Sequence, residues 1–139
     1  MIVDAMIDTN VLVYAASRAE ADAEKSRIAG ELIERRRVGV SAQVLQEFIV
    51  TTTRKSARNW TLAEALDWLD ALGTLPCIDV DAALVRHGVG IATTHRISYW
   101  DGAILAAAHA LGAPVLYTED LNHGQRYGAV QAINPFRPN

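Results

Sequence analysis

Asp8 ends the first apolar run of the chain and is followed at once by Thr9 and Asn10. A carboxylate, a hydroxyl and an amide therefore meet where a short buried strand is expected to end. In open α/β sheets, ligands bind at the carboxyl ends of the strands. This position makes Asp8 the first residue of a candidate site.

Acids recur at three later places that adjoin an expected strand end or helix start: Glu47, Asp101, and the adjacent pair Glu119 and Asp120. In a parallel sheet these places face one edge, where converging carboxylates repel each other unless a cation lies among them. Mg²⁺ takes oxygen ligands and is usually held by one or two carboxylates together with substrate phosphate. The acids therefore predict a Mg²⁺ or Mn²⁺ site that serves phosphodiester cleavage.

Each acid also has a purely structural interpretation. Asp8 and the acids at 119–120 could form solvated turns, and Glu47 could be an ordinary surface residue. Asp101 is the last residue of a capping-box pattern that starts at Ser98, so it could serve the helix end instead of a ligand. The two roles of Asp101 are compatible, because a cap needs only one carboxylate oxygen.

The apolar periodicities predict an α/β fold with a parallel, Rossmann-like sheet of about five strands and helices on both faces. The expected strands are 2–7, 38–41, 77–80, 115–118 and 129–133, and the expected helices are 11–16, 19–36, 42–53, 61–72, 81–93 and 98–112. Two successive helices separate the second strand from the third, and the third from the fourth. We expect residues 1–139 to form a single domain.

Charge and cysteine content narrow the protein class. The net charge is −3, which taken alone disfavours a nucleic-acid binder. Bound cations would reverse the sign locally, and eleven of the thirteen basic residues are Arg, which suits bidentate phosphate contacts. Arg clusters lie at 35–37 and at Arg54, Lys55 and Arg58, although a solvated helix face is the simpler interpretation of each. The chain has a single cysteine, Cys77, and contains neither an apolar stretch long enough for a membrane nor a signal peptide. These features predict a cytoplasmic protein without membrane contact.

Histidines and aromatic residues add weaker signals. The four histidines lack zinc-ligand spacing, although His95 and His123 are expected on loops where they could touch a phosphate. Tyr99 and Trp100 directly precede Asp101 and are expected to pack in the core, with base stacking by one of them as the alternative. The chain has no P-loop and no G-x-G-x-x-G motif, so no nucleotide cofactor is indicated.

Five motifs together resemble the PIN domain and, more narrowly, the VapC toxins of VapBC toxin–antitoxin pairs. They are Ile7-Asp-Thr-Asn-Val-Leu12, Gln46-Glu-Phe48, Tyr99-Trp-Asp-Gly-Ala-Ile104, Thr118-Glu-Asp-Leu121 and Ile133-Asn-Pro-Phe136. The resemblance follows the whole chain in order. It implies a PIN-like sheet with strand order 3-2-1-4-5 and a Mg²⁺- or Mn²⁺-dependent endoribonuclease.

The resemblance also assigns roles to the site residues. Asp8 and Asp101 would be the principal metal ligands, and Glu47 and Asp120 would complete the site directly or through water. Asp120 is favoured over Glu119 as the fourth acid. Thr9 would orient Asp8 or a water molecule and Asn10 would support the turn, while Thr118 and Glu119 would lie just outside the ligands.

The partners implied by the resemblance are an RNA substrate and a VapB-type antitoxin whose C-terminal segment enters the toxin's active site. Homodimers and hetero-oligomers with the antitoxin are expected. A non-toxin PIN nuclease and a non-catalytic PIN-like RNA-binding module remain alternatives. A haloacid-dehalogenase-like phosphohydrolase is disfavoured because it needs a second Asp where Asn10 stands and a late Lys, and no Lys follows Lys55. The missing late Lys also disfavours a phospho-receiver domain.

Overall fold

The computed structural model describes residues 3–54 and 60–138, so Ile2, Lys55 and Arg58 of the sequence predictions lie outside it. Within these residues the chain forms six α-helices, one 3-10 turn and six strands. In chain order these are β1 (Ala5–Ile7), α1 (Thr9–Ala16), η1 (Glu20–Asp22), α2 (Ala23–Arg35), β2 (Val38–Ser41), α3 (Ala42–Thr53), α4 (Leu62–Leu72), β3 (Cys77–Ile78), α5 (Ala82–His95), α6 (Tyr99–Ala110), β4 (Val115–Tyr117), β5 (Arg126–Tyr127) and β6 (Val130–Ile133).

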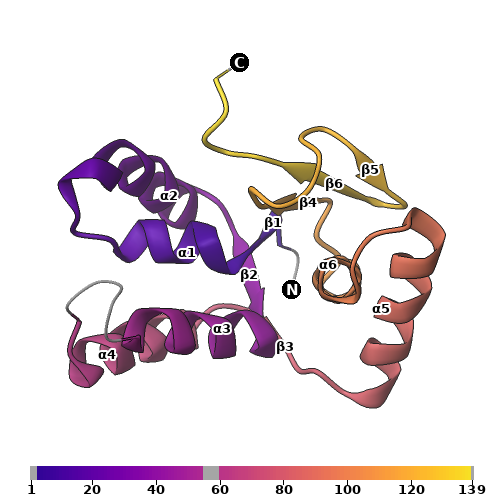
Figure 1. Ribbon diagram of the computed structural model, residues 1–139, viewed down its shortest axis with the longest axis horizontal. Helices are drawn as coiled ribbons and strands as arrows, with labels where there is room; N and C mark the ends of the chain where they lie inside the picture. Colours follow the sequence, from indigo (N-terminus) through magenta and orange to yellow (C-terminus); the bar gives the residue numbers. More distant parts are fainter. Residues whose placement is uncertain (1–2, 55–59, 139) are drawn as a thin grey trace.

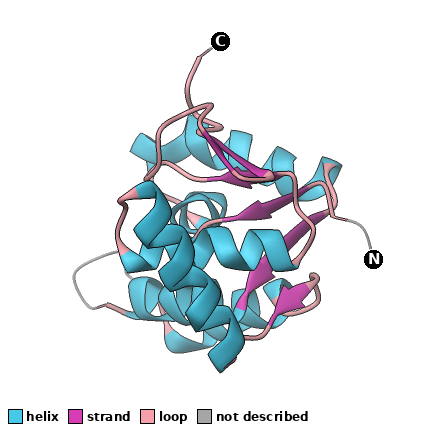
Figure 2. Ribbon diagram, turned by 90° about the vertical axis from the view of Figure 1, so that its right-hand side faces the viewer, coloured by secondary structure: helices cyan, strands magenta, loops and turns pink. Residues whose placement is uncertain are grey.

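The strands form one sheet in the order β3-β2-β1-β4-β6-β5. Every pairing is parallel except that of β5 with β6. Helices α1 to α4 lie on one side of the sheet and α5 and α6 on the other (Figure 1), and the strands run side by side in the interior (Figure 2). The predicted α/β fold with its two-helix connections is confirmed, and the order 3-2-1-4-5 holds when β6 is counted as the fifth strand.

The prediction of about five strands missed β5. This short strand pairs antiparallel with β6. The two residues between Tyr127 and Val130 form the loop that connects the two strands. Gly128 has a φ of +63°, a conformation that glycine adopts without strain and that suits the tight turn of a hairpin. A two-residue strand carries too little periodicity to be recognised from sequence.

Side-chain caps start most of the helices at the predicted places. Ser41, Asp81 and Ser98 accept hydrogen bonds from the third residue of α3, α5 and α6, respectively. Thr61 and Glu64 form the full predicted capping box of α4. The predicted helix 19–36 is too long, because a 3-10 turn at its start leaves α2 to begin at Ala23.

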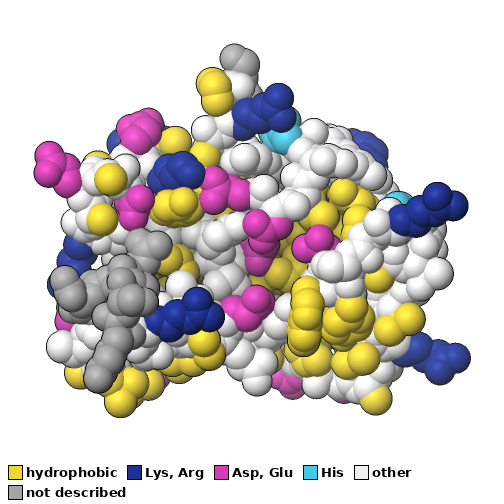
Figure 3. All heavy atoms as spheres, in the orientation of Figure 1, with side chains coloured by type: hydrophobic (Ala, Val, Ile, Leu, Met, Phe, Trp, Pro, Cys, Tyr) yellow, Lys and Arg dark blue, Asp and Glu magenta, His cyan; other side chains and the backbone are white. Residues whose placement is uncertain are grey.

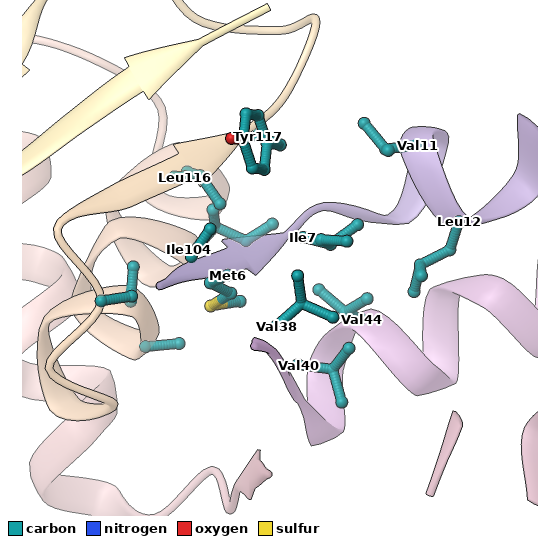
Figure 4. Packing of buried hydrophobic residues seen from close by; sticks show 14 of the residues in the cluster. Met6, Ile7, Val11, Leu12, Val38, Val40, Val44, Ile104, Leu116 and Tyr117 are labelled. Atoms are coloured by element: carbon teal, nitrogen blue, oxygen red, sulfur yellow. The ribbon is translucent and has the colours of Figure 1, made fainter. Parts of the chain in front are cut away.

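The hydrophobic core follows the central strands and the helices on both sides. Met6 and Ile7 of β1 are fully buried and lie near Val38 and Val40 of β2 and Leu116 of β4 (Figure 4). These strands are apolar on both faces because helices cover both. None of the helices in the described residues is long and apolar enough to cross a membrane.

Candidate active site

Asp8 lies where β1 passes into α1, and its carboxylate is buried, with 6% of the residue exposed. One carboxylate oxygen accepts a hydrogen bond from the Thr9 N–H at 2.7 Å, which caps α1. The other accepts from the Thr118 hydroxyl, also at 2.7 Å. Burial raises the pKa of Asp8 to about 6, and the negative charges of Asp120 and Glu47 add to this, while the two hydrogen bonds oppose it.

Glu47 enters the site from the second turn of α3. Its Oε1 accepts hydrogen bonds from the Thr9 hydroxyl at 3.4 Å and from the Gln43 amide at 3.3 Å. The side chain therefore faces Asp8 instead of pointing away from the sheet, although it remains exposed to solvent.

Asp120 follows β4 and faces α1. Its Oδ1 accepts a hydrogen bond from the Asn10 amide at 3.3 Å, and its N–H donates to the Thr118 hydroxyl at 3.0 Å. Partial burial raises the pKa of Asp120, and the charges of Asp101 and Glu119 add to the effect. Asn10, expected to support the turn, thus contacts Asp120 through its side-chain amide.

Glu119 points away from Asp120 although the two are adjacent in sequence. Its Oε2 accepts a hydrogen bond from Lys25 Nζ of α2 at 2.8 Å and forms a salt bridge with it. This hydrogen bond is the main cause of the raised pKa of Lys25, which also donates to the Tyr14 hydroxyl. Asp120, and not Glu119, is the acid that faces the other carboxylates.

Asp101 lies in the first turn of α6 and is half-buried. Ser98 caps the helix by accepting from the Asp101 N–H at 3.1 Å. Within the described residues, however, the Asp101 carboxylate makes no return bond to Ser98, so the predicted capping box is only half formed. The carboxylate is therefore available to a ligand, and its charge acts on both Asp120 and Tyr127.

A pocket of about 280 Å³ opens at this edge of the sheet. It is lined by Asp8, Thr9, Asn10, Val13, Tyr14, Glu47, Thr51 and Asp120. The structure thus gathers three of the four predicted acids around one pocket, and Asp101 acts on Asp120 from outside its lining. Acidic side chains gather near the middle of this face of the molecule (Figure 3).

The charge of this site is not compensated by the protein. Asp8, Glu47 and Asp120 are held by neutral donors, and no Lys or Arg in residues 3–54 and 60–138 pairs with any of the four predicted acids. Asn10 also has a buried Oδ1 without a hydrogen-bond partner there. An uncompensated set of oxygen donors suits a hard divalent cation.

The site is open rather than a closed cage. Among the described residues there is no group of three or more His, Cys, Asp or Glu side chains that could by themselves hold a metal ion. Mg²⁺ keeps several of its waters and shares its remaining positions between one or two carboxylates and substrate phosphate. The donor set therefore fits a weakly held ion better than a permanent structural one.

Neither of the two histidines that were expected on loops lines this pocket. His123 Nδ1 accepts from the Asn134 N–H, so it supports the C-terminal segment. His95 ends α5 instead of lying in a loop, and its ring packs edge-on against Tyr127 at 5.0 Å. The arginines at 35–37 precede β2 and so lie at the amino edge of the sheet, opposite the acids.

The prediction that Trp100 packs in the core is wrong. This residue is 66% exposed in the first turn of α6, next to Asp101, with its ring edge-on to Tyr99 at 5.2 Å. Lys25 could not be recognised as part of this region from the sequence. No local pattern marks it, because its partner Glu119 lies 94 residues away.

The chain is thus an α/β protein with a mostly parallel sheet and with carboxylate side chains at the carboxyl ends of its strands. The sequence profile of the PIN domain family matches residues 5–128, and the chain belongs to that family. Members of this family are typically metal-dependent nucleases. No curated protein sequence matches the chain.

Several solved structures share the fold at low sequence identity. A toxin–antitoxin complex from Klebsiella pneumoniae is 19% identical, with a TM-score of 0.72 over 96% of this chain and 99% of that one. A sarcin–ricin loop cleaving VapC toxin from Mycobacterium tuberculosis is 17% identical, with a TM-score of 0.66 over 84% and 89%. A VapBC complex from Rickettsia felis, bound to a DNA fragment from its promoter, is 22% identical, with a TM-score of 0.62 over 95% and 97%.

Proposed function

We propose that this PIN-domain protein is a Mg²⁺- or Mn²⁺-dependent endoribonuclease and the toxin of a VapBC-like, type II toxin–antitoxin pair. The observation that carries the nuclease proposal is the set of four carboxylates at one sheet edge without a Lys or Arg partner among the described residues. A protein keeps such charges together at a cost in stability, which a bound cation offsets.

Asp8 and Asp101 would be the principal metal ligands, with Glu47 and Asp120 directly or through water. When bound, the metal would supply Lewis acidity, which acidifies water and offsets charge on the scissile phosphate. The protein's own contribution is orientation. Thr9 and Thr118 hold both oxygens of Asp8, so this carboxylate needs little reorganisation when the ion and RNA bind.

The other pocket residues hold the outer acids. Thr9 and Gln43 restrain Glu47, and Asn10 restrains Asp120. These donors are neutral, so they orient the carboxylates without removing the negative charge that attracts the ion. Glu47 and Asp120 are exposed to solvent, so either one could take a proton from a water molecule positioned between it and the phosphate.

The nuclease proposal is tested with purified protein and a mixed RNA substrate. Cleavage should require Mg²⁺ or Mn²⁺, stop with chelator, and fall at least 100-fold in Asp8→Asn and Asp101→Asn, both checked for folding by circular dichroism. Asp67→Asn, on the exposed side of α4, removes a charge of the same kind and should retain activity. Full cleavage by both site variants would refute the assignment.

The toxin role rests on the shared fold of the toxin-containing structures and on the motif resemblance. Expression of the chain should arrest bacterial growth, and co-expression of a VapB-type antitoxin encoded beside it should restore growth and form a complex. The proposed oligomers are a homodimer and a larger assembly with the antitoxin. Harmless expression of protein that cuts RNA in vitro would instead identify a PIN nuclease outside toxin–antitoxin pairs.

A further inference from the structure

Two adjacent acids, Glu119 and Asp120, follow β4, and only one of them faces the other carboxylates. Glu119 is bound by Lys25 at 2.8 Å, whereas Asp120 is bound by the neutral amide of Asn10 at 3.3 Å. The two side chains therefore part toward α2 and α1, respectively. The positive charge of Lys25 offsets the negative charge of Glu119 at the rim of the acidic site. The same salt bridge joins α2 to the loop after β4.

Lys25 is confined by more than its salt bridge. Its Nζ lies 3.3 Å from the Tyr14 hydroxyl, 4.5 Å from the centre of the Tyr14 ring and 5.2 Å from the centre of the Phe136 ring. The two rings pack edge to face at 5.2 Å. We call Lys25, Tyr14, Phe136 and Glu119 the lysine clamp. It joins α2, α1, the C-terminal segment and the loop after β4.

This surrounding makes Lys25 a poor direct ligand for RNA phosphate. One carboxylate, one hydroxyl and two ring faces already surround the ammonium group, and such cation–π contacts favour its charged form in this place. The side chains of Lys25 and Glu119 are only 38% and 24% exposed. Tyr14 is shared with the lining of the acidic pocket, so the clamp forms part of the wall of the site.

We propose that Lys25 is a positioning residue of the candidate metal site: it holds Glu119 away from the carboxylates and leaves Asp120 alone to complete them. This inference rests on the proposed function only in assuming that the site takes a divalent cation. Without the clamp, Glu119 would be free to turn toward the same pocket. With a fifth carboxylate, the site would bind the ion more tightly. That carboxylate would also occupy coordination positions of the ion that water and phosphate need.

The test measures Mn²⁺ binding by calorimetry, together with kcat and KM for RNA. Lys25→Met, which keeps the side-chain length and removes the charge, should bind Mn²⁺ about three- to tenfold more tightly and lose about tenfold in kcat with little change in KM. The double variant Lys25→Met/Glu119→Gln should return both values to within about twofold of the wild type, because the released carboxylate is gone. Lys25→Arg should resemble the wild type.

A second comparison holds even where Lys25→Met does not fold. Glu119→Gln alone should leave Mn²⁺ affinity within about twofold of the wild type, whereas Asp120→Asn should weaken it at least tenfold. Equal losses in these two variants would overturn the proposal. So would a double variant no better than Lys25→Met, or a rise in KM at unchanged Mn²⁺ affinity, which would mark Lys25 as a direct phosphate contact.

The outcomes also separate this proposal from the nuclease proposal. Mn²⁺ binding that follows the expected pattern, without RNA cleavage by the wild type, would support the clamp and refute the nuclease. RNA cleavage without rescue by Glu119→Gln would support the nuclease and refute the clamp. A wild-type protein that binds no Mn²⁺ would refute both.

Discussion

Replacing Asp8 with Asn should abolish the proposed activity and yet stabilise the metal-free protein at neutral pH. Asp8 is buried, and its pKa in the folded chain is about 6 against an ordinary value of 3.8. Ionised Asp8 is thus less stable in the folded chain than in the unfolded one. The folded state holds the Asp8 proton more tightly, so stability falls as the pH rises from about 4 through about 6.

The magnitude follows from the pKa difference. About two pKa units at 1.36 kcal/mol each correspond to roughly 3 kcal/mol of stability lost by the wild type once Asp8 is ionised. Asn keeps the size and the cap of α1, because its oxygen can still accept from the Thr9 N–H. The Thr118 hydroxyl can accept from the new amide instead of donating. Allowing ~1 kcal/mol for weaker hydrogen bonds, we expect Asp8→Asn to be about 1–2 kcal/mol more stable than the wild type above pH 7.

The assay is urea unfolding of the wild type and Asp8→Asn between pH 4 and pH 8 in the presence of chelator. Asp67→Asn serves as the charge control, because it removes an exposed carboxylate on α4. Near pH 4, where folded Asp8 is protonated, Asp8→Asn should lose this advantage and become about 1 kcal/mol less stable than the wild type, because only its weaker hydrogen bonds remain. Excess Mg²⁺ should stabilise the wild type, by ~2.7 kcal/mol at one hundred times the dissociation constant, and leave Asp8→Asn unchanged.

Two results would refute this reasoning. A wild type that is as stable as Asp8→Asn at pH 7.5 without metal would mean that Asp8 carries no burial penalty. An advantage of Asp8→Asn that does not change between pH 4 and pH 8 would mean that the substitution acts through packing or hydrogen bonding instead of charge.

Three further predictions concern other parts of the molecule. Thr118→Val removes a hydrogen bond that lowers the pKa of Asp8, so carboxyl carbon NMR of the metal-free protein should show this pKa above its wild-type value, and an unchanged value would contradict the assignment. Trp100→Ala should raise KM for RNA about tenfold, since base stacking is worth ~1–3 kcal/mol, with Trp100→Phe near wild type; equal KM values would exclude stacking. Gly102→Ala would place a Cβ against the backbone of α5 and should lower the free energy of unfolding by about 1–3 kcal/mol in calorimetry. Gly90→Ala adds its Cβ in open space on α5 and should raise it by ~0.5–1 kcal/mol. Similar melting temperatures of the two variants would contradict the close packing of α5 on α6.

Much of the fold was predictable because its signals are local. Ser41, Asp81 and Ser98 cap helices within three residues of themselves, and the box of Thr61 and Glu64 does the same. The central strands are short apolar runs that helices must cover on both faces. The two-residue strand β5 escaped prediction because its pairing depends on β6 and on a glycine turn, neither of which creates a periodic pattern.

The candidate site divides in the same way. Asp8, Glu47 and Asp101 were recognisable because each stands at a strand end or near a helix start, and alternating strands and helices bring such places to one edge. The exposure of Trp100 could not be recognised from the sequence. An aromatic residue at the edge of a buried helix face gives the same sequence pattern whether its ring points inward or outward.

The sequence by itself determined the class of fold, the starts of α3 to α6 and the edge at which the acids gather, because hydrophobic periodicity and capping act over a few residues. Only the tertiary structure shows where the two adjacent acids point: Asp120 lines the pocket, whereas Glu119 pairs with Lys25. The Thr118 bond to Asp8 and the Asn10 bond to Asp120 each join residues 110 positions apart, and Lys25 reaches Glu119 across 94. Such contacts arise when β1 pairs with β4 and α2 packs against α1. No local sequence pattern shows which way a side chain points when that depends on a distant partner.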